Sequence, residues 1–274
     1  MPAMASRAEQ KAAARAAREA RQREMSAAQA RRMRLIWLAG LVAAAALVIV
    51  IIAVAVGGGN GSKSVGAKTA QAKVAALLKG IPQSANVQGG IVLGNPNAPV
   101  TMTEYGDLVC PICQEFALGP EQQLIANEVR AGKVKIVYRA DETASQSANN
   151  GEFTAGQVAA RAAGLQKLGW NYILLWYEEQ QSELTPYVTA SFLAGLARQI
   201  PGLNMAKWNA QLQNPNLAGY VSVDGQSMNQ LVANHSIPGN ATPTLLFSGP
   251  KGSVPPVQAA APYAALKIAI KDVS

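Results

Sequence analysis

The residues best suited to chemistry in this chain are its two cysteines, Cys110 and Cys113, which enclose the sequence CPIC. Two thiols at this spacing can form a disulfide that opens and closes without unfolding a domain, and the thiolate is the nucleophile in that exchange. A structural disulfide around so short a loop would add little stability. The single His leaves too few ligands for a four-ligand zinc site. The motif therefore predicts redox chemistry, with an inert staple or half of a shared metal site as alternatives.

The segments around this CPIC motif predict that it lies where a strand meets a helix. The run VTMTEY (100–105) is strand-like, and residues 114–132 have roughly helical spacing of apolar residues. A second strand is expected at 134–140. Pro111 suits a first helical turn, where its missing N–H costs nothing.

A thiol at the start of a helix has an unusual electrostatic environment. Unpaired N–H groups and the positive end of the helix dipole stabilise a thiolate there. We therefore expect the pKa of Cys110 to lie below that of a free cysteine, with Cys110 as the attacking sulfur. Cys113, one turn into the helix, is expected to be more buried and to act as the resolving thiol.

Two separate segments resemble DsbA-like proteins of the thioredoxin superfamily. The first is GNPNAPVTMTEYGDLVCPICQEF (94–116), and the second is ATPTLLFSG (241–249). In that family a Thr-Pro or Val-Pro pair precedes a strand, and its cis proline packs against the CxxC motif. The resemblance implies an α/β, thioredoxin-like fold over about residues 88–274. It also implies that Thr242 and Pro243 form the cis-proline loop at the site.

The same resemblance implies a mainly helical insertion between the two motifs, at about residues 150–235, and a closing helix is expected at 261–273. Aromatic side chains within the insertion are more typical of core packing than of a cofactor site. These residues are Trp170, Tyr172, Trp176 and Tyr177.

Three further polar residues near the motifs are candidates for a role in the site. DsbA-like and thioredoxin-like proteins often keep a buried acid under the CxxC motif, so Glu104 is either that acid, taking the proton of Cys113, or a solvated strand carboxylate. Asp107 is expected to form the turn rather than act as a base. His235, the only His, is expected to be an exposed loop residue.

The sequence departs from DsbA-type oxidases in two places. Ile112 stands where those oxidases have a His that stabilises the thiolate, and Thr242 precedes the proline where they have Val. Both differences lead away from a strongly oxidising enzyme, so the residues leave the redox direction open.

The N-terminal part of the chain predicts a membrane anchor. The 274-residue chain has a net charge of +8, of which +6 falls within residues 1–34. Residues 35–56 follow without a charge or a proline, a length that spans about 33 Å as a helix. Arg31, Arg32 and Arg34 border this span, so the positive-inside rule places residues 1–34 in the cytoplasm and the rest of the chain outside. A cleavable signal peptide is the alternative.

We therefore expect four parts along the chain: a basic cytoplasmic tail (1–34), a transmembrane helix (35–56), a linker (57–84) that contains a short helix at 70–80, and a DsbA-like domain (85–274). The expected function is that of a membrane-anchored, extracytoplasmic thiol–disulfide oxidoreductase that forms, reduces or isomerises disulfides. Its expected partners are secreted proteins, the lipid bilayer and, in the oxidative direction, a quinone-linked membrane oxidase. Neither a cofactor nor nucleic acid is expected. A redox-inactive scaffold or metallochaperone is the alternative.

Overall fold

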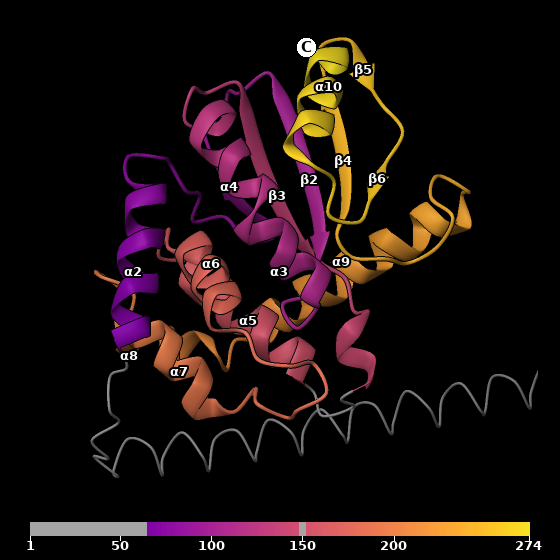
Figure 1. Ribbon diagram of the computed structural model, residues 1–274. Coiled ribbons are helices and arrows are strands. Elements are labelled where there is room, and N and C mark those ends of the chain that lie inside the picture. The colour runs from indigo at the N-terminus through magenta and orange to yellow at the C-terminus, as the bar shows by residue number, and fades with distance from the viewer. Residues whose placement is uncertain (1–64, 148–151) are drawn as a thin grey trace, which may run out of the picture. The chain divides into compact units, whose positions relative to one another are not determined.

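A mixed β-sheet lies at the centre of the computed structural model, which describes residues 65–147 and 152–274 (Figure 1). Its strands run in the order β1-β3-β2-β4-β5, and β6 also pairs with β4. Strands β2 and β3 are parallel, and the other pairings are antiparallel. The strands are β1 (Ile91–Leu93), β2 (Val100–Gly106), β3 (Val134–Ala140), β4 (Thr244–Gly249), β5 (Gly252–Ser253) and β6 (Val257–Gln258).

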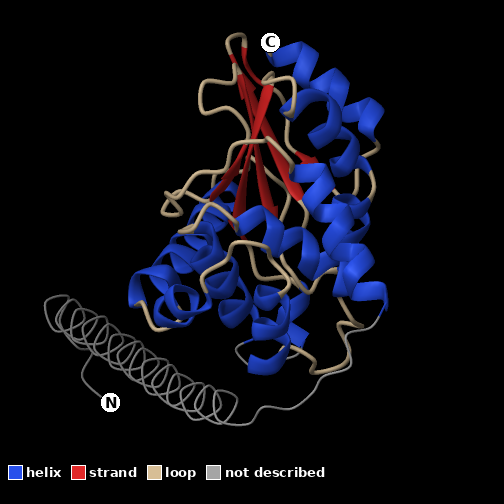
Figure 2. Cartoon of the chain, turned by 90° about the vertical axis from the view of Figure 1, so that its left-hand side faces the viewer, coloured by secondary structure: helices blue, strands red, loops and turns tan. Residues whose placement is uncertain are grey.

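In the described part of the chain, helices lie along one side of this sheet and below it in Figure 2. Between β3 and β4 the chain forms the expected helical insertion, which begins near residue 152 and ends at residue 233. The helical segments are α2 (Val65–Leu78), α3 (Pro111–Leu118), α4 (Pro120–Leu124), the π-helix η1 (Ile125–Val129), the 3-10 helix η2 (Ala144–Ser147), α5 (Glu152–Gly164), α6 (Gly169–Glu179), α7 (Ala190–Arg198), α8 (Met205–Gln211), α9 (Pro215–Ala233) and α10 (Tyr263–Val273).

One face of the sheet is the main hydrophobic core. Alternate residues along a strand point to the same face, and Met102 on β2 lies in register with Ile136 on β3 and Phe247 on β4. All three are fully or almost fully buried. The same alternation places Glu104, two residues after Met102, on this apolar face.

The insertion contributes a layer of aromatic side chains to the core. The four aromatic residues expected there, Trp170, Tyr172, Trp176 and Tyr177, are all completely buried. Trp170 also donates its indole N–H to the backbone carbonyl of Ile91 on β1, 3.0 Å away. Burial of aromatic rings supplies much of the stabilisation of such a layer, and these rings are core residues as predicted.

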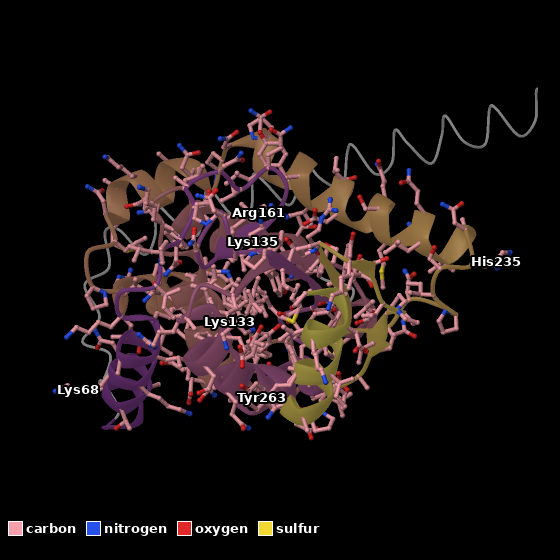
Figure 3. The ribbon with its side chains drawn as sticks, turned by 90° about the horizontal axis from the view of Figure 1, so that it is seen from above. Lys68, Lys133, Lys135, Arg161, His235 and Tyr263 are labelled. Atoms are coloured by element: carbon pink, nitrogen blue, oxygen red, sulfur yellow. The ribbon has the colours of Figure 1, made fainter. Side chains whose placement is uncertain are left out.

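A buried ionic cluster joins the insertion to the sheet. Asp224 on α9 accepts hydrogen bonds from Arg139 on β3, at 2.8 Å, and from the backbone N–H of Ala140, at 2.9 Å. Arg161 on α5 forms an ion pair with the same carboxylate. Arg161 is 1% exposed, and Figure 3 labels it within the outline of the molecule. A buried charge is tolerated only when it is paired and hydrogen-bonded, and this carboxylate is.

The helix after the CPIC motif is interrupted, although the sequence predicted one helix up to Gly132. Gly119 has φ −120° and ψ −97°, outside the helical region, and separates α3 from α4. Pro120 follows, lacks a backbone N–H and restricts the conformation of the residue before it. It occupies the first turn of α4, where proline is well accommodated.

The folded part begins earlier than the expected boundary at residue 85. The helix expected at 70–80 extends from Val65 to Leu78. Ala70, Val74 and Leu78 lie on one face of it and are buried in the core. Residues 70–81 therefore contribute to the core rather than forming part of the linker we expected. Strand β1 was not predicted either, because three apolar residues are too short a pattern to identify a strand.

The predicted basic tail (1–34), the predicted span (35–56) and the first part of the predicted linker (57–64) lie outside the described residues. Among the helices that are described, none has both the length and the apolar character needed to cross a bilayer.

Candidate functional site

The CPIC motif lies at the junction that the sequence predicted. β2 ends at Gly106, and Cys110 is the N-cap of α3, with φ −68° and ψ 123°. Pro111 occupies the first helical turn. Gln114 donates its backbone N–H to the carbonyl of Cys110, at 3.1 Å, which closes the first turn. The Cys110 side chain therefore lies at the end of the helix where backbone N–H groups are unpaired.

Asp107 holds the turn before the motif. Its buried carboxylate accepts a hydrogen bond from the N–H of Val109, at 3.0 Å, two residues ahead. It also accepts from the N–H of Thr143, at 3.0 Å, and from the N–H and the hydroxyl of Ser145, at 2.9 and 2.7 Å. The predicted role as a turn-former is confirmed. The carboxylate also ties this turn to the segment after β3.

The predicted cis-proline loop meets the attacking cysteine. The peptide bond between Thr242 and Pro243 is cis, and the Sγ of Cys110 lies 3.5 Å from the carbonyl oxygen of Thr242. The side chain of Thr242 lies 2.5 Å from that of Thr143, hydroxyl to hydroxyl. Two segments that are more than 130 residues apart in the chain thus form one site.

The two thiols differ sharply in environment. Both are free cysteines. Cys110 retains 6% exposure, whereas Cys113 has none. The pKa of Cys110 is lowered to about 6, chiefly by a hydrogen bond from the Cys113 thiol. Burial opposes this shift, whereas hydrogen bonds from Thr242 and from the backbone N–H groups of Cys113 and Ile112 add to it. Burial raises the pKa of Cys113 well above its ordinary value. Cys110 is thus the less buried of the two thiols and the one whose thiolate is favoured, which is what an attacking thiol requires.

The sequence left two roles open for Glu104, a buried acid or a solvated strand carboxylate, and the structure shows that it is buried. It is 1% exposed, and neither of its carboxyl oxygens has a hydrogen-bond partner of suitable geometry among the described residues. Burial raises the pKa of Glu104 to about 7. Its charge also contributes to the raised pKa of Cys113, so the two groups interact electrostatically. A carboxyl with a pKa near neutrality can take up or release a proton at physiological pH.

A second buried acid, Glu121, was not predicted. It is completely buried on α4, and its carboxyl oxygens likewise have no partner of suitable geometry in the described residues. Burial, together with the charge of Glu104, raises its pKa well above the ordinary value. Two carboxyls that interact in an apolar interior cannot both ionise without a large penalty. The site therefore contains a pair of acids that holds at least one proton at neutral pH.

Helix α6 and the loop after it hold the start of α3 from the side. Gln114 on α3 donates its side-chain N–H to the carbonyl of Tyr177, at 2.7 Å. Gln180 donates its side-chain N–H to the carbonyl of Val109, also at 2.7 Å. The helical insertion thus fixes the position of the CPIC motif. Ile112, which lies between Pro111 and Cys113 in the motif, is 41% exposed.

His235 lies at the end of α9 and is exposed, as predicted. Figure 3 shows it pointing outward at the far end of that helix. Its φ of 53° places its backbone in the left-handed region. We assign it no part in the site.

Comparisons with known proteins agree with this fold. The sequence profile described as thioredoxin matches residues 86–271. The oxidised form of BdbD from Bacillus subtilis has 21% sequence identity and a TM-score of 0.54, and the alignment covers 70% of this chain and 96% of that one. For alpha-DsbA1 from Wolbachia pipientis the identity is 16% and the TM-score 0.54, with coverage of 66% and 89%.

A third solved structure has the same fold. MdbA, a thiol–disulfide oxidoreductase from Corynebacterium diphtheriae, has 17% identity and a TM-score of 0.51, with coverage of 61% of this chain and 85% of that one. No curated protein matches the sequence. The expected DsbA-like, thioredoxin-type fold with a helical insertion is confirmed.

Proposed function

Because the chain belongs to the thioredoxin family, we propose that it is a thiol–disulfide oxidoreductase whose dithiol is Cys110 and Cys113. The observation that carries this proposal is the position of the Cys110 sulfur. It lies at the start of α3 and 3.5 Å from the carbonyl oxygen of Thr242 in the cis-proline loop. The lowered pKa of about 6 makes this sulfur mostly thiolate at neutral pH. The fold and family of the chain support the same enzyme class.

In the reductive direction, the Cys110 thiolate attacks one sulfur of a substrate disulfide. A new S–S bond joins Cys110 to the substrate, and the other substrate sulfur leaves as a thiolate. Cys113 then gives its proton to Glu104 and attacks the Cys110 sulfur. This second step closes the disulfide between the two cysteines and releases the remaining substrate thiolate. The substrate gains two electrons, which the protein dithiol loses.

The same steps in reverse oxidise a substrate dithiol. An oxidised Cys110–Cys113 disulfide accepts two electrons from the substrate, and the reduced protein must then pass them to an acceptor. A quinone-linked membrane oxidase is the class of acceptor that suits an anchored enzyme. The uninterrupted apolar run at 35–56, bordered by arginines, supports the anchor and an extracytoplasmic position for the catalytic domain.

The Thr242–Pro243 loop has a separate role in binding. The Thr242 carbonyl faces the reacting sulfur, and we propose that the backbone of this loop pairs with an extended substrate peptide, as in strand addition. This pairing recognises backbone rather than sequence. It therefore suits an enzyme that acts on many secreted proteins.

The test is insulin reduction by the full chain with a thiol reductant, compared with its Cys110→Ala variant. We expect the variant to lose the activity, because it lacks the attacking sulfur. The control is His235→Ala, at an exposed residue to which we assign no part in the site, and this variant should keep the activity. Full biological function in the Cys110→Ala variant would favour a scaffold instead. Equilibration with glutathione buffers then gives the reduction potential, and a value near that of cytosolic thioredoxin would exclude the oxidase role.

A further inference from the structure

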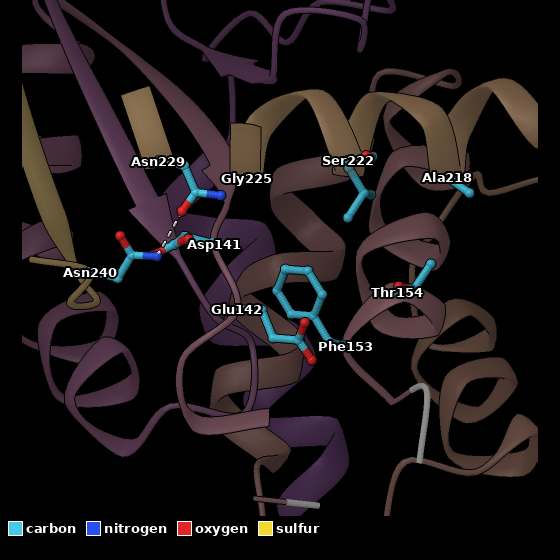
Figure 4. Close-up of a pocket in the computed structure, with 10 residues that line it drawn as sticks. Asp141, Glu142, Phe153, Thr154, Ala218, Ser222, Gly225, Asn229 and Asn240 are labelled. Carbon is cyan, nitrogen blue, oxygen red and sulfur yellow. Dashed lines mark hydrogen bonds between the residues drawn. The ribbon is translucent and has the colours of Figure 1, made fainter. Parts of the chain in front are cut away.

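A pocket of about 310 Å³ lies beside the cis-proline loop. Figure 4 shows its lining, which comes from the segment after β3, from α5, from α9 and from the residues before Thr242. Asn240 is two residues before Thr242, and Asp141 donates its backbone N–H to the carbonyl of Gly106 at the end of β2, 3.0 Å away. The pocket is therefore connected to the site through Asn240 and Asp141, although no residue of the site itself lines it. We call it the acidic pocket.

The polar groups of the acidic pocket are acceptors or neutral amides and hydroxyls. Asp141 and Glu142 are its two ionisable residues, and none of the ten described residues that line it is Lys, Arg or His. Figure 4 shows Asn229 and Asn240 near Asp141, where the two amides are joined by a hydrogen bond of 3.3 Å. Negative charge therefore dominates the lining of this pocket.

One carboxyl oxygen of Asp141 is available to a ligand. Asp141 is 2% exposed, and its Oδ2 has no hydrogen-bond partner among the described residues. A buried carboxylate oxygen without a partner is unfavourable unless a donor reaches it. Burial, then the neighbouring charges of Asp107 and Glu142, raise the pKa of Asp141 to about 7, so an added cation would stabilise its ionised form.

The size and the apolar part of the pocket indicate what kind of cation fits. A volume of about 310 Å³ is about ten times the share of one water molecule in the liquid, which is far more room than a bare ion needs. Figure 4 shows the ring of Phe153 beside Glu142. An aromatic ring next to a carboxylate suits a side chain with an apolar stem and a charged end, since the stem packs on the ring while the cation meets the acid.

We propose that the acidic pocket binds a lysine or arginine side chain of the substrate peptide held at the Thr242–Pro243 loop. This inference rests on the proposed function and adds a substrate preference to it. Asp141 supplies a buried carboxyl that a bound cation would hold in its ionised form, and the exposed Glu142 supplies a second carboxyl. Asp141 and Glu142 are thus specificity residues that take no part in the bond changes.

The experiment uses the full chain carrying Cys113→Ser, which stops the reaction at the mixed disulfide with Cys110. Cysteine peptides activated as thionitrobenzoate disulfides release a coloured thiolate when Cys110 attacks. In one set, lysine stands in turn at each of the two positions before and after the cysteine. A matched set has methionine there, which is similar in length and uncharged. At one or more positions we expect the lysine peptide to react about fivefold faster.

Variants test whether the acidic pocket causes this preference. Asp141→Asn and Glu142→Gln, each added to the Cys113→Ser background, should reduce it to about twofold or less while the methionine peptides keep their rate. Asp272→Asn, on the exposed face of α10, removes the same charge elsewhere and should leave the preference intact. Because Asp141 is buried, circular dichroism checks the folding of its variant. The exposed Glu142 variant provides an independent result.

Each other outcome overturns the inference. If methionine and lysine peptides react equally fast at every position, the pocket does not select cations, although the proposed function stands. If no peptide reacts with the chain, the proposed function itself fails. A lysine preference that survives both pocket variants would place its cause elsewhere. If calcium ions raise the thermal midpoint of the full chain but not of Asp141→Asn, the pocket is a metal site instead.

Discussion

Replacing Cys113 by alanine should raise the pKa of Cys110. The hydrogen bond from the Cys113 thiol is the largest of the interactions that lower this pKa to about 6. A hydrogen bond to a charged group contributes about 1.5–3 kcal/mol, and about 1.4 kcal/mol corresponds to one pH unit. The titration midpoint of Cys110 in the Cys113→Ala variant should therefore lie about one to two pH units higher.

The reactivity of the thiol at neutral pH should change accordingly. A thiol with a pKa of about 6 is about 90% thiolate at pH 7, and the same thiol after this change would be about 10–50% thiolate. The assay is the rate of alkylation by iodoacetamide as a function of pH. The chain has two cysteines, so Cys110 is the only thiol left in the variant.

Serine at position 113 provides the matched control. Cys113→Ser also removes the second thiol but keeps a hydroxyl that can donate to the Cys110 sulfur, so its midpoint should stay close to that of the wild type. If both variants titrate at the wild-type midpoint, the hydrogen bond from position 113 is not the cause. The helix N–H groups alone would then hold the pKa down. Equal upward shifts in both variants would also contradict the reasoning, because the serine hydroxyl would then be giving no stabilisation.

Three further predictions concern stability and proton transfer. Between pH 7 and pH 5, the reduced protein should lose about 1.4 kcal/mol more of its free energy of unfolding than its Cys110→Ala variant, as measured by urea unfolding. The reason is that the pKa of Cys110 falls on folding, so this stabilisation disappears as the pH drops through about 6. Equal losses would refute this. Glu104→Gln should slow the attack by Cys113 at pH 7 about 10- to 100-fold in stopped-flow turnover, with Cys110 alkylation unchanged, since it removes the proton acceptor; an unaltered rate would count against Glu104. Gly106→Ala should destabilise the fold by about 1–3 kcal/mol in thermal unfolding, because its Cβ would lie 2.6 Å from the buried ring of Tyr138, and an unchanged midpoint would show that the ring moves aside.

The parts of the site that carry a local sequence signature could be predicted. A cysteine directly before a helix with proline in its first turn indicates both the helix start and the lowered pKa of Cys110. The Thr242–Pro243 pair identified the second half of the site through its resemblance to a family, and the structure brings the two halves together. Strand alternation placed Glu104 on one face, but its burial depended on what packs there, which the pattern does not contain.

Features that arise from the packing of distant segments could not be predicted. Glu121 lies in the polar sequence PEQQL, which is typical of an exposed helix, yet it is completely buried on α4, after the break at Gly119 and Pro120. The acidic pocket combines residues from 141 to 240, so no local pattern reveals it. Helix α2 was placed in a linker because its apolar residues are mostly alanine and give only a weak periodic signal.

The pairing of Asp224 with Arg139 and Arg161 has a consequence for how the molecule comes apart. One carboxylate on α9 neutralises guanidinium groups on a strand and on α5. Detaching α9 would leave the guanidinium groups of Arg139 and Arg161 without their carboxylate partner. Arg161 is buried, and removing one partner of a buried ion pair costs about 3–5 kcal/mol. The insertion and the sheet should therefore unfold in a single transition. Proteolytic cleavage within α9 should unfold the sheet and the insertion together.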